Sequence, residues 1–411
     1  MASKNSSERV APEVVGMSAS RLARIGDHLK RYVDEGRLPG WQVLVARSGR
    51  IALLEQYGQR DVEAAAPVTE DTLFRIYSMT KPITSVALMT LYEQGRFQLD
   101  DPIERFIPEL ANLQVFASGD ADAFETVPAD RAVTIRDLLT HTAGFTYGFM
   151  HAHPVDALYR SRDIGGVATP GTLHEMVTKL SDTPLLFQPG TRWSYSVATD
   201  IVGHLIERIA GEALDVFLQQ TLFEPLGMSD TGFRVAPEAV DRFAACYEKT
   251  ADGFRLTDAP ATSPYLSRPS FLSGGGGLVS TAEDYLKFCL MLLNKGTLNG
   301  NRILGRKTLA LMRLNHLPTG DDLTSMGQPV FSETRYDGIG FGLGWSVVLD
   351  PARAQISGSV GELAWGGMAS TAFWVDPVED LAVVFMTQLT PSSSYPIRRE
   401  LRTLVYQALE D

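Results

Sequence analysis

Apolar residues near the start of the chain recur first at helical and then at strand-like spacing. Between residues 18 and 35 they fall every three or four positions, at Leu22, Ile25, Leu29 and Val33. This spacing, closed by Gly36, predicts an amphipathic helix. Two apolar runs follow, WQVLVAR from residue 41 and IALLEQYG from residue 51, and the Ser-Gly-Arg between them is typical of a hairpin turn. The chain therefore opens with a helix and two strands.

The end of the chain shows a similar mixture, whereas helical patterns dominate the middle. Strand-like runs begin at residues 341 (FGLGWSVVL), 370 (STAFWVD) and 381 (LAVVFMTQL), and a closing helix is expected over residues 396–409. The segments SVALMTLYEQG, VTIRDLLTHTAG, DIVGHLIERIAG and TAEDYLKFCLMLLNKG predict helices in between. We expect an α/β protein of two domains, with a sheet domain from residues 1–77 and 324–411 and an inserted all-helical domain over residues 78–323.

Residues 145–171 lack a clear period and are rich in Gly, His, Pro and Tyr. This composition predicts a long loop, and long loops in compact proteins often shape binding sites. Tyr147 and Phe149 in this stretch are therefore candidate substrate-binding residues. A surface insertion without function is the alternative.

The charge of the chain limits its partners. The 37 basic and 49 acidic residues give a net charge of -12, which repels nucleic acid and anionic lipid surfaces. No run approaches the roughly 18 apolar residues of a membrane span, and residues 1–10 (MASKNSSERV) lack the apolar core of a secretory signal. We expect a cytoplasmic protein with no nucleic-acid or membrane partner; the oligomeric state stays open.

The two cysteines, Cys246 and Cys289, lie far apart without metal-type spacing, and we expect both to be reduced packing residues. His141, His151 and His153 are candidate zinc ligands, but the chain has no His-Glu-x-x-His helix and no cysteine cluster. The sequence therefore predicts neither a metal nor a cofactor.

Ser78 and Lys81 are the first candidates for catalysis. They lie at the start of an apolar helical segment, with Pro82 at a position typical of a first helical turn. A spacing of three places both side chains on one helical face, and the helix dipole favours negative charge developing at Ser78. An N-capping serine beside a solvated lysine is the alternative for this pair taken alone.

Tyr195 is the second candidate, in the segment FQPGTRWSYSV that precedes a predicted helix. A serine hydroxyl needs a nearby proton acceptor to become a good nucleophile. A phenol has an ordinary pKa of about 10, which an adjacent ammonium lowers. The alternative is a tyrosine that only packs beside Trp193.

The segment ELAWGGM, residues 362–368, is the third candidate. Paired glycines beside a strand allow a ligand to approach the backbone closely. Such an edge can aim an N–H at an acyl oxygen and complete an oxyanion hole with the N–H of Ser78. A simple turn is the alternative.

Together these motifs resemble the serine β-lactamase and penicillin-binding protein superfamily, whose signature is Ser-x-x-Lys, then Tyr-x-Asn or Ser-x-Asn, then Lys-Thr-Gly. The chain is most similar to the family VIII carboxylesterases, which are related to class C β-lactamases. LLTHTAG (residues 138–144), FEPLGM (223–228) and SGGGGLVST (273–281) also contribute to the resemblance. It implies a β-lactamase-like antiparallel sheet flanked by terminal helices, with the active site at the interface of the two domains.

The resemblance also implies roles for individual residues. Ser78 is the acylated nucleophile, Lys81 its charge partner and Tyr195 the general base, although the base role of Lys81 stays open. Trp365, Gly366 and Gly367 take the place of Lys-Thr-Gly, and the backbone of Met368 supplies the second oxyanion donor.

Two departures from the β-lactamase pattern bear on the substrate. Trp365 replaces a lysine that attracts the substrate carboxylate, and Val197 replaces an asparagine that hydrogen-bonds an amide. Both changes favour neutral, apolar esters, and we expect a short-to-medium acyl chain.

The sequence thus predicts a serine carboxylesterase that acts through a covalent acyl-enzyme. Amide chemistry on the same fold (a β-lactamase, a D-amino-acid peptidase or another amide hydrolase) and acyl transfer to an alcohol remain alternatives. A catalytically inactive sensor domain is a further alternative. An α/β-hydrolase is a weak alternative, because no serine is placed in a Gly-x-Ser-x-Gly motif.

Overall fold

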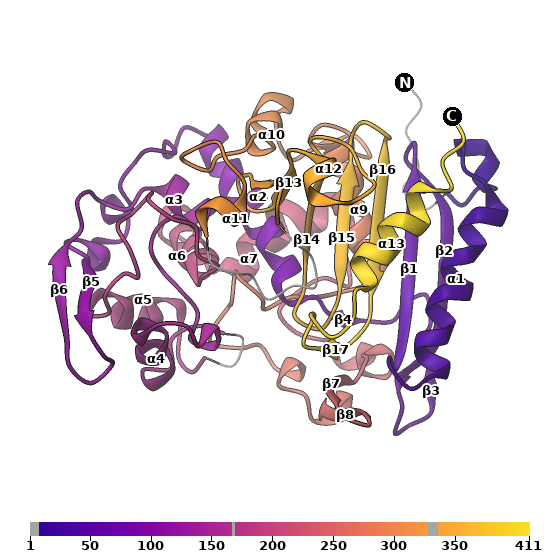
Figure 1. Cartoon of the computed structure of the whole chain (residues 1–411), viewed down its shortest axis with the longest axis horizontal. Helices are drawn as coiled ribbons and strands as arrows, with labels where there is room; N and C mark the ends of the chain where they lie inside the picture. Colours follow the sequence, from indigo (N-terminus) through magenta and orange to yellow (C-terminus); the bar gives the residue numbers. More distant parts are fainter. Residues whose placement is uncertain (1–7, 167–168, 328–335) are drawn as a thin grey trace.

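The computed structural model describes residues 8–166, 169–327 and 336–411, and its largest feature is an eight-stranded antiparallel sheet (Figure 1). Its strand order is β12-β13-β14-β15-β16-β1-β2-β3. The strands are β1 (Gly40–Arg47), β2 (Arg50–Asp61), β3 (Ala66–Pro67), β12 (Ile339–Phe341), β13 (Ser346–Val348), β14 (Leu363–Gly366), β15 (Ala372–Asp376) and β16 (Leu381–Met386). Because β1 pairs with β16, the two ends of the chain build one sheet.

Alternate side chains of β1 enter two different hydrophobic cores, as the period-2 geometry of a strand requires. Trp41, Val43 and Val45 pack with residues of helices α1 (Ala19–Asp34) and α13 (Ile397–Tyr406). Leu44 and Ala46 belong to the larger core that contains the central helices of the chain. Every residue of β1 is buried, because helices cover both faces of the sheet at this strand.

Three helices form the centre of the larger core. They are α2 (Thr80–Glu93), α6 (Ala198–Ala210) and α9 (Ala282–Leu293), and almost every residue of α2 is buried. The other helices are α3 (Ile135–Leu139), α4 (Pro154–Ser161), α5 (Leu173–Ser181), α7 (Leu214–Leu218), α8 (Glu224–Leu226), α10 (Arg306–Met312), α11 (Leu323–Met326) and α12 (Pro351–Ala354). In Figure 1 the helices α3 to α6 lie to the left of the large sheet, α13 lies in front of it near β16 and β1, and α1 lies at its right end.

Small sheets also occur in the middle of the chain, so this part is not purely helical. They pair β4 (Phe74–Arg75) with β9 (Val279–Ser280), β5 (Gln114–Gly119) with β6 (Phe124–Pro128), β7 (Cys246–Thr250) with β8 (Gly253–Asp258), and β10 (Thr297–Leu298) with β11 (Asn301–Arg302). The predicted domain boundaries at residues 77/78 and 323/324 stay predictions.

Several expected elements differ in extent from the observed ones. The run from residue 341 is not one strand, because the N–H of Gly342 bonds to the carbonyl of Trp345 and turns the chain between β12 and β13. The run from residue 381 ends β16 at Met386 and then adds β17 (Leu389–Thr390), which pairs with β7. The helix expected over residues 133–144 is limited to α3.

The loop expected over residues 145–171 contains a helix. His153 caps α4 through Nδ1, which accepts from the N–H of Val155, and Asp156 completes a capping box. Pro154 starts the helix, where its missing N–H costs nothing. Eight residues are too few for the hydrophobic period to stand out from the surrounding loop.

No helix of the described residues is long and apolar enough to cross a membrane.

The closing helix α13 is fixed to the sheet by a buried charged cluster. The hydroxyl of Tyr406 lies 2.6 Å from Oε2 of Glu362 and 2.8 Å from Oδ2 of Asp376. Arg402 pairs with Glu362, which is fully buried. Burial raises the pKa of Glu362, and the charge of Arg402 opposes this rise. The cluster therefore links one face of α13 to the strands β14 and β15.

We predict that Tyr406→Phe lowers the free energy of unfolding by about 1.5 to 3 kcal/mol, because it removes a hydrogen bond to a buried charged group. Urea denaturation measures this loss. Tyr57→Phe is the matched control: its hydroxyl bonds to Asp34 at 3.0 Å, but Tyr57 is 38% exposed, so we expect a change within about 0.5 kcal/mol. Equal effects of the two substitutions would show that the cluster does not fix α13.

Candidate active site

Ser78 lies at the junction between strand β4 and helix α2. One turn of 3-10 helix, Tyr77–Met79, leads directly into α2, so Ser78 sits at a helix N-terminus that favours developing negative charge. Tyr77 has a φ of 42°, a left-handed conformation that costs a bulky residue roughly 1 to 2 kcal/mol. Its ring is buried against Cys246 and Ala369, and this packing holds the strained backbone that presents Ser78.

Lys81 follows one turn later, and its side chain is almost completely buried at 1% exposure. Its Nζ lies 2.7 Å from the carbonyl oxygen of Gly275, 3.0 Å from the hydroxyl of Tyr147 and 3.4 Å from Oγ of Ser78. An ammonium has three hydrogens to donate, and three acceptors surround this one. The side chain of Lys81 is therefore buried with three hydrogen-bond partners.

Tyr195 completes the group. Its hydroxyl lies 2.6 Å from Oγ of Ser78, and Nζ of Lys81 lies 4.5 Å from the centre of its ring. The structure thus brings together three side chains that are up to 117 positions apart in the sequence. This contact puts the phenol oxygen within hydrogen-bond reach of the serine hydroxyl, which is the distance that general acid–base catalysis requires.

The segment that carries Tyr195 is bound to the turn after α3. The N–H of Ser194 donates to the carbonyl of His141, and Nδ1 of His141 lies 3.0 Å from Oγ of Ser196. Burial lowers the pKa of His141 well below its usual range, and the charge of Lys81 lowers it further. His141 therefore supports Tyr195 as a neutral ring and not as a second cation.

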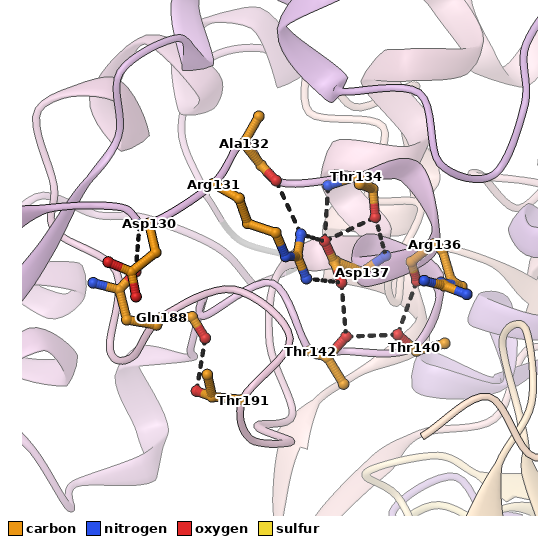
Figure 2. Close-up of polar contacts among 10 residues, drawn as sticks. All are labelled: Asp130, Arg131, Ala132, Thr134, Arg136, Asp137, Thr140, Thr142, Gln188 and Thr191. Carbon is orange, nitrogen blue, oxygen red and sulfur yellow. Dashed lines mark hydrogen bonds and ion pairs between the residues drawn. The ribbon is translucent and has the colours of Figure 1, made fainter. Parts of the chain in front are cut away.

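Asp137 is the centre of the polar network that supports this turn (Figure 2). Its carboxylate accepts from both terminal nitrogens of Arg131, at 2.6 and 3.0 Å, and from the N–H and Oγ of Thr134 at 2.8 Å. The hydroxyl of Thr142 donates to the same carboxylate at 3.3 Å. The backbone carbonyl of Thr142 accepts from the N–H of Gly190. The cap of α3 is thus connected to the segment that leads to Tyr195.

A cavity of about 580 Å³ opens beside Ser78 and Tyr195. Most of the side chains that line it are aromatic or apolar: Tyr77, Tyr147, Phe149, Pro170, Tyr195, Tyr336, Trp365, Met368 and Pro391. Tyr147 and Phe149 are stacked with ring centres 4.6 Å apart. Residues 147–170 contribute seven lining positions, so the segment expected to shape a pocket does line this cavity.

Trp365, Gly366, Gly367 and Met368, at the end of β14 and just after it, also line the cavity. A Cβ on Gly367 would come within 2.5 Å of the carbonyl oxygen of Ile76, so only glycine lets β14 approach the backbone before Ser78 this closely. Met368 is 47% exposed at the mouth of the cavity. Its N–H as an oxyanion donor stays a prediction.

Val197 does not reach the cavity. Val197 is fully buried. A Cβ added to Gly165 would lie only 2.2 Å from Cγ1 of Val197, so Val197 packs behind this glycine, which lines the cavity. The expected direct contact between Val197 and a substrate is therefore not supported. The position acts on the cavity only through Gly165.

Sequence reasoning missed several residues that line the cavity, and three of them bear on the chemistry of the site. Asp200 and Gly275 lie beside Lys81, and Arg398 comes from the closing helix and donates to the carbonyls of Gly367 and Thr371 at 2.9 and 3.0 Å. The sequence shows four consecutive glycines that include Gly275, but it does not show that Gly275 contacts Lys81. Nothing in the pattern of α13 distinguishes Arg398 from a surface arginine.

The candidate zinc ligands do not come together. His141 supports Tyr195, and His153 caps α4 and contacts Phe116 at a ring distance of 4.7 Å. Within the described ranges, no group of three or more His, Cys, Asp or Glu side chains is arranged to hold a metal ion. Cys246 and Cys289 are both buried and unpaired with each other.

We predict that Asp137→Ala lowers the free energy of unfolding by about 2 to 3 kcal/mol, because it removes a helix cap and leaves buried donors without their acceptor. Chemical denaturation measures the effect. Thr191→Val serves as the control, because the hydroxyl of Thr191 makes one exposed bond to the carbonyl of Gln188, and its loss should cost about 0.5 kcal/mol or less. A stable Asp137→Ala protein would contradict the support role of the network in Figure 2.

Comparisons with known proteins agree with this geometry. Residues 25–407 match the Beta-lactamase family. The chain is 37% identical to an uncharacterized protein of Mycobacterium tuberculosis, across 89% of this chain and 90% of the relative. It is 33% identical to esterase EstB of Burkholderia gladioli, across 95% and 96% of the two chains.

The solved structure of EstCE1, described as a hydrolase with promiscuous acyltransferase activity, superposes with a TM-score of 0.80 at 30% identity and covers 94% of this chain and 99% of the other. The resemblance inferred from the motifs and the expected fold class are both confirmed. The chain belongs to the Beta-lactamase family and is a serine hydrolase of that family.

Proposed function

We propose that the protein is a carboxylesterase that hydrolyses neutral esters of short-to-medium acyl chain length through an acyl-enzyme on Ser78. The observation that carries this proposal is the 2.6 Å contact between Tyr195 and Ser78, with the nitrogen of Lys81 3.4 Å from the same serine oxygen. A hydroxyl held between a proton acceptor and a cation is an activated nucleophile.

In the proposed acylation step, Oγ of Ser78 attacks the ester carbonyl and its proton passes to the oxygen of Tyr195. The carbonyl electrons move to the oxygen, and the N–H groups of Ser78 and Met368 stabilise this oxyanion. Collapse of the intermediate breaks the bond to the alcohol, which takes the proton from Tyr195. Water then attacks the acyl group in the same way and releases the acid.

The cavity supports the choice of a neutral substrate. Trp365 presents an aromatic surface, with its ring 5.5 Å from that of Tyr195. Asp163 and Asp200 are carboxylates among the lining residues and disfavour an anionic acyl group, while the cation of Arg398 is bonded to two backbone carbonyls. A volume of about 580 Å³ falls within the range of small-molecule sites.

Acyl transfer is the second candidate, because EstCE1 is described as a hydrolase with promiscuous acyltransferase activity. The first half-reaction is the same for both functions, and the acceptor decides between them. If an alcohol enters the cavity in place of water, the acyl group leaves as a new ester. Adding butanol to a hydrolysis assay and measuring butyl ester against free acid separates the two outcomes.

We predict that the wild-type protein hydrolyses p-nitrophenyl butyrate and that Ser78→Ala reduces this turnover to background while the circular dichroism spectrum is unchanged. Alanine fits because the Ser78 side chain is small and lies at the cavity surface. Nitrocefin, a β-lactam, should be hydrolysed at least about 100-fold less efficiently, a difference in transition-state stabilisation of roughly 2.7 kcal/mol. Preference for nitrocefin would replace the esterase proposal by a β-lactamase.

We predict that Tyr195→Phe lowers kcat for the same ester by about 10² to 10⁴, the usual contribution of a general base. Tyr147→Phe is the matched comparison, because it also removes a phenol oxygen near Lys81 but one that contacts Nζ and not Ser78. Its loss should be about tenfold, the value of one hydrogen bond. The reverse order would move the base role from Tyr195 to Tyr147.

A further inference from the structure

We infer that Asp200 is a positioning residue whose buried carboxylate holds Lys81 in its ammonium form, so that Tyr195 and not Lys81 accepts the proton of Ser78. This inference rests on the proposed function. It also assigns a charge state to Lys81 and the base role to Tyr195, which the motifs alone left open.

Asp200 lies in the first turn of α6, five positions after Tyr195, and is 1% exposed. Its Oδ1 accepts from Oγ of Ser273 at 2.6 Å and from the N–H of Gly275 at 2.9 Å. Its Oδ2 is buried and has no hydrogen-bond partner within the described part of the chain. A buried carboxylate with one unsatisfied oxygen is costly unless a nearby cation compensates its charge.

Gly275 connects this carboxylate to Lys81. Its N–H donates to Asp200, while its carbonyl accepts from Nζ of Lys81 at 2.7 Å. A Cβ at this position would lie 2.9 Å from Oδ2 of Asp200 and 3.1 Å from the hydroxyl of Tyr147. Only a glycine therefore allows the carboxylate, the phenol and the ammonium to surround one backbone position.

The charges around Lys81 support the same conclusion. The titratable groups that face it from the packed elements are Tyr147, Tyr195, His141 and Asp200. Of these four groups, Asp200 is the carboxylate. Burial raises the pKa of Asp200, and the charge of Lys81 is the largest influence that opposes the rise.

The two phenols then have different roles. Burial raises the pKa of Tyr147 well above its usual value, and the charge of Asp200 adds to this rise, so Tyr147 keeps its proton. Tyr195 is the phenol in contact with Ser78, and the ammonium lies over its ring. A permanent cation favours the phenolate form of Tyr195, whereas a neutral amine would itself be a base.

The test is Asp200→Asn, which removes the charge and keeps the shape. The measurement is the rate at which a fluorophosphonate labels Ser78 as a function of pH. In this reaction a bond forms between Oγ and phosphorus, the phosphorus–fluorine bond breaks, fluoride leaves, and the serine proton passes to the active-site base. The rate should rise with pH in the wild type as the Lys81–Tyr195 pair loses a proton.

Without the carboxylate the pair loses this proton more easily. In the curve of labelling rate against pH, the rising limb of Asp200→Asn should therefore move to lower pH by about one unit. The plateau rate at high pH should fall at least about tenfold, because the neutral amine no longer supports a phenolate. Ser273→Ala is the matched control: it removes one hydrogen bond from the same carboxylate but keeps the charge, so its rising limb should stay in place. If Asp200→Asn does not fold, Asp200→Ser, which leaves room for a water molecule, replaces it.

A lower plateau with an unmoved limb would overturn the inference, because Asp200 would then act only through its hydrogen bonds. A moved limb with an undiminished plateau would also overturn it and would make Lys81 the base. The pH comparison tests the role of Asp200 independently of the proposed esterase function. Wild-type protein that is labelled at Ser78 but does not hydrolyse p-nitrophenyl butyrate would refute the esterase proposal and leave the pH comparison intact.

Discussion

The buried ammonium of Lys81 is the interaction on which the rest of the site depends. A charge in this position is stable only if acceptors replace the water that it loses. A backbone carbonyl, a phenol and the serine supply three such acceptors, and each comes from a different part of the chain. The fold must therefore be complete before the cation is compensated, and the same contacts that stabilise it bring Ser78 within reach of Tyr195.

Close backbone approach is the second constraint. Gly275 and Gly367 both line the cavity beside Ser78, and at each of them a Cβ would collide with a neighbouring group. The first collision would be with the carboxylate beside Lys81, and the second with the backbone that leads to Ser78. The lack of a Cβ at these two glycines thus determines where the amino group of Lys81 lies and how near β14 comes to the oxygen of Ser78. An additional hydrogen bond could not have the same effect.

The cavity explains how one catalytic group can serve several reactions within a family. In the proposed reaction the acyl-enzyme depends on the contacts around Ser78, whereas the cavity that would receive the substrate is lined by residues of the 145–170 segment, of β14 and of α13, among others. Trp365 and the stacked pair of Tyr147 and Phe149 give this surface aromatic faces. Relatives described as an esterase and as a hydrolase with acyltransferase activity are consistent with this division between chemistry and specificity.

The sequence by itself determined the local features of this protein. Helical spacing located α1 and α2, short apolar runs located β1 and β15, and the three-residue interval put Ser78 and Lys81 on one helical face. Motif order identified Tyr195 and the glycine pair of β14. Only the tertiary structure decided that Val197 lies behind the wall, that Arg398 and Asp200 line the cavity, and that Lys81 is surrounded by acceptors. The physical reason is that periodicity and spacing report interactions between neighbours in the chain, whereas the burial of a charge depends on atoms more than a hundred positions away.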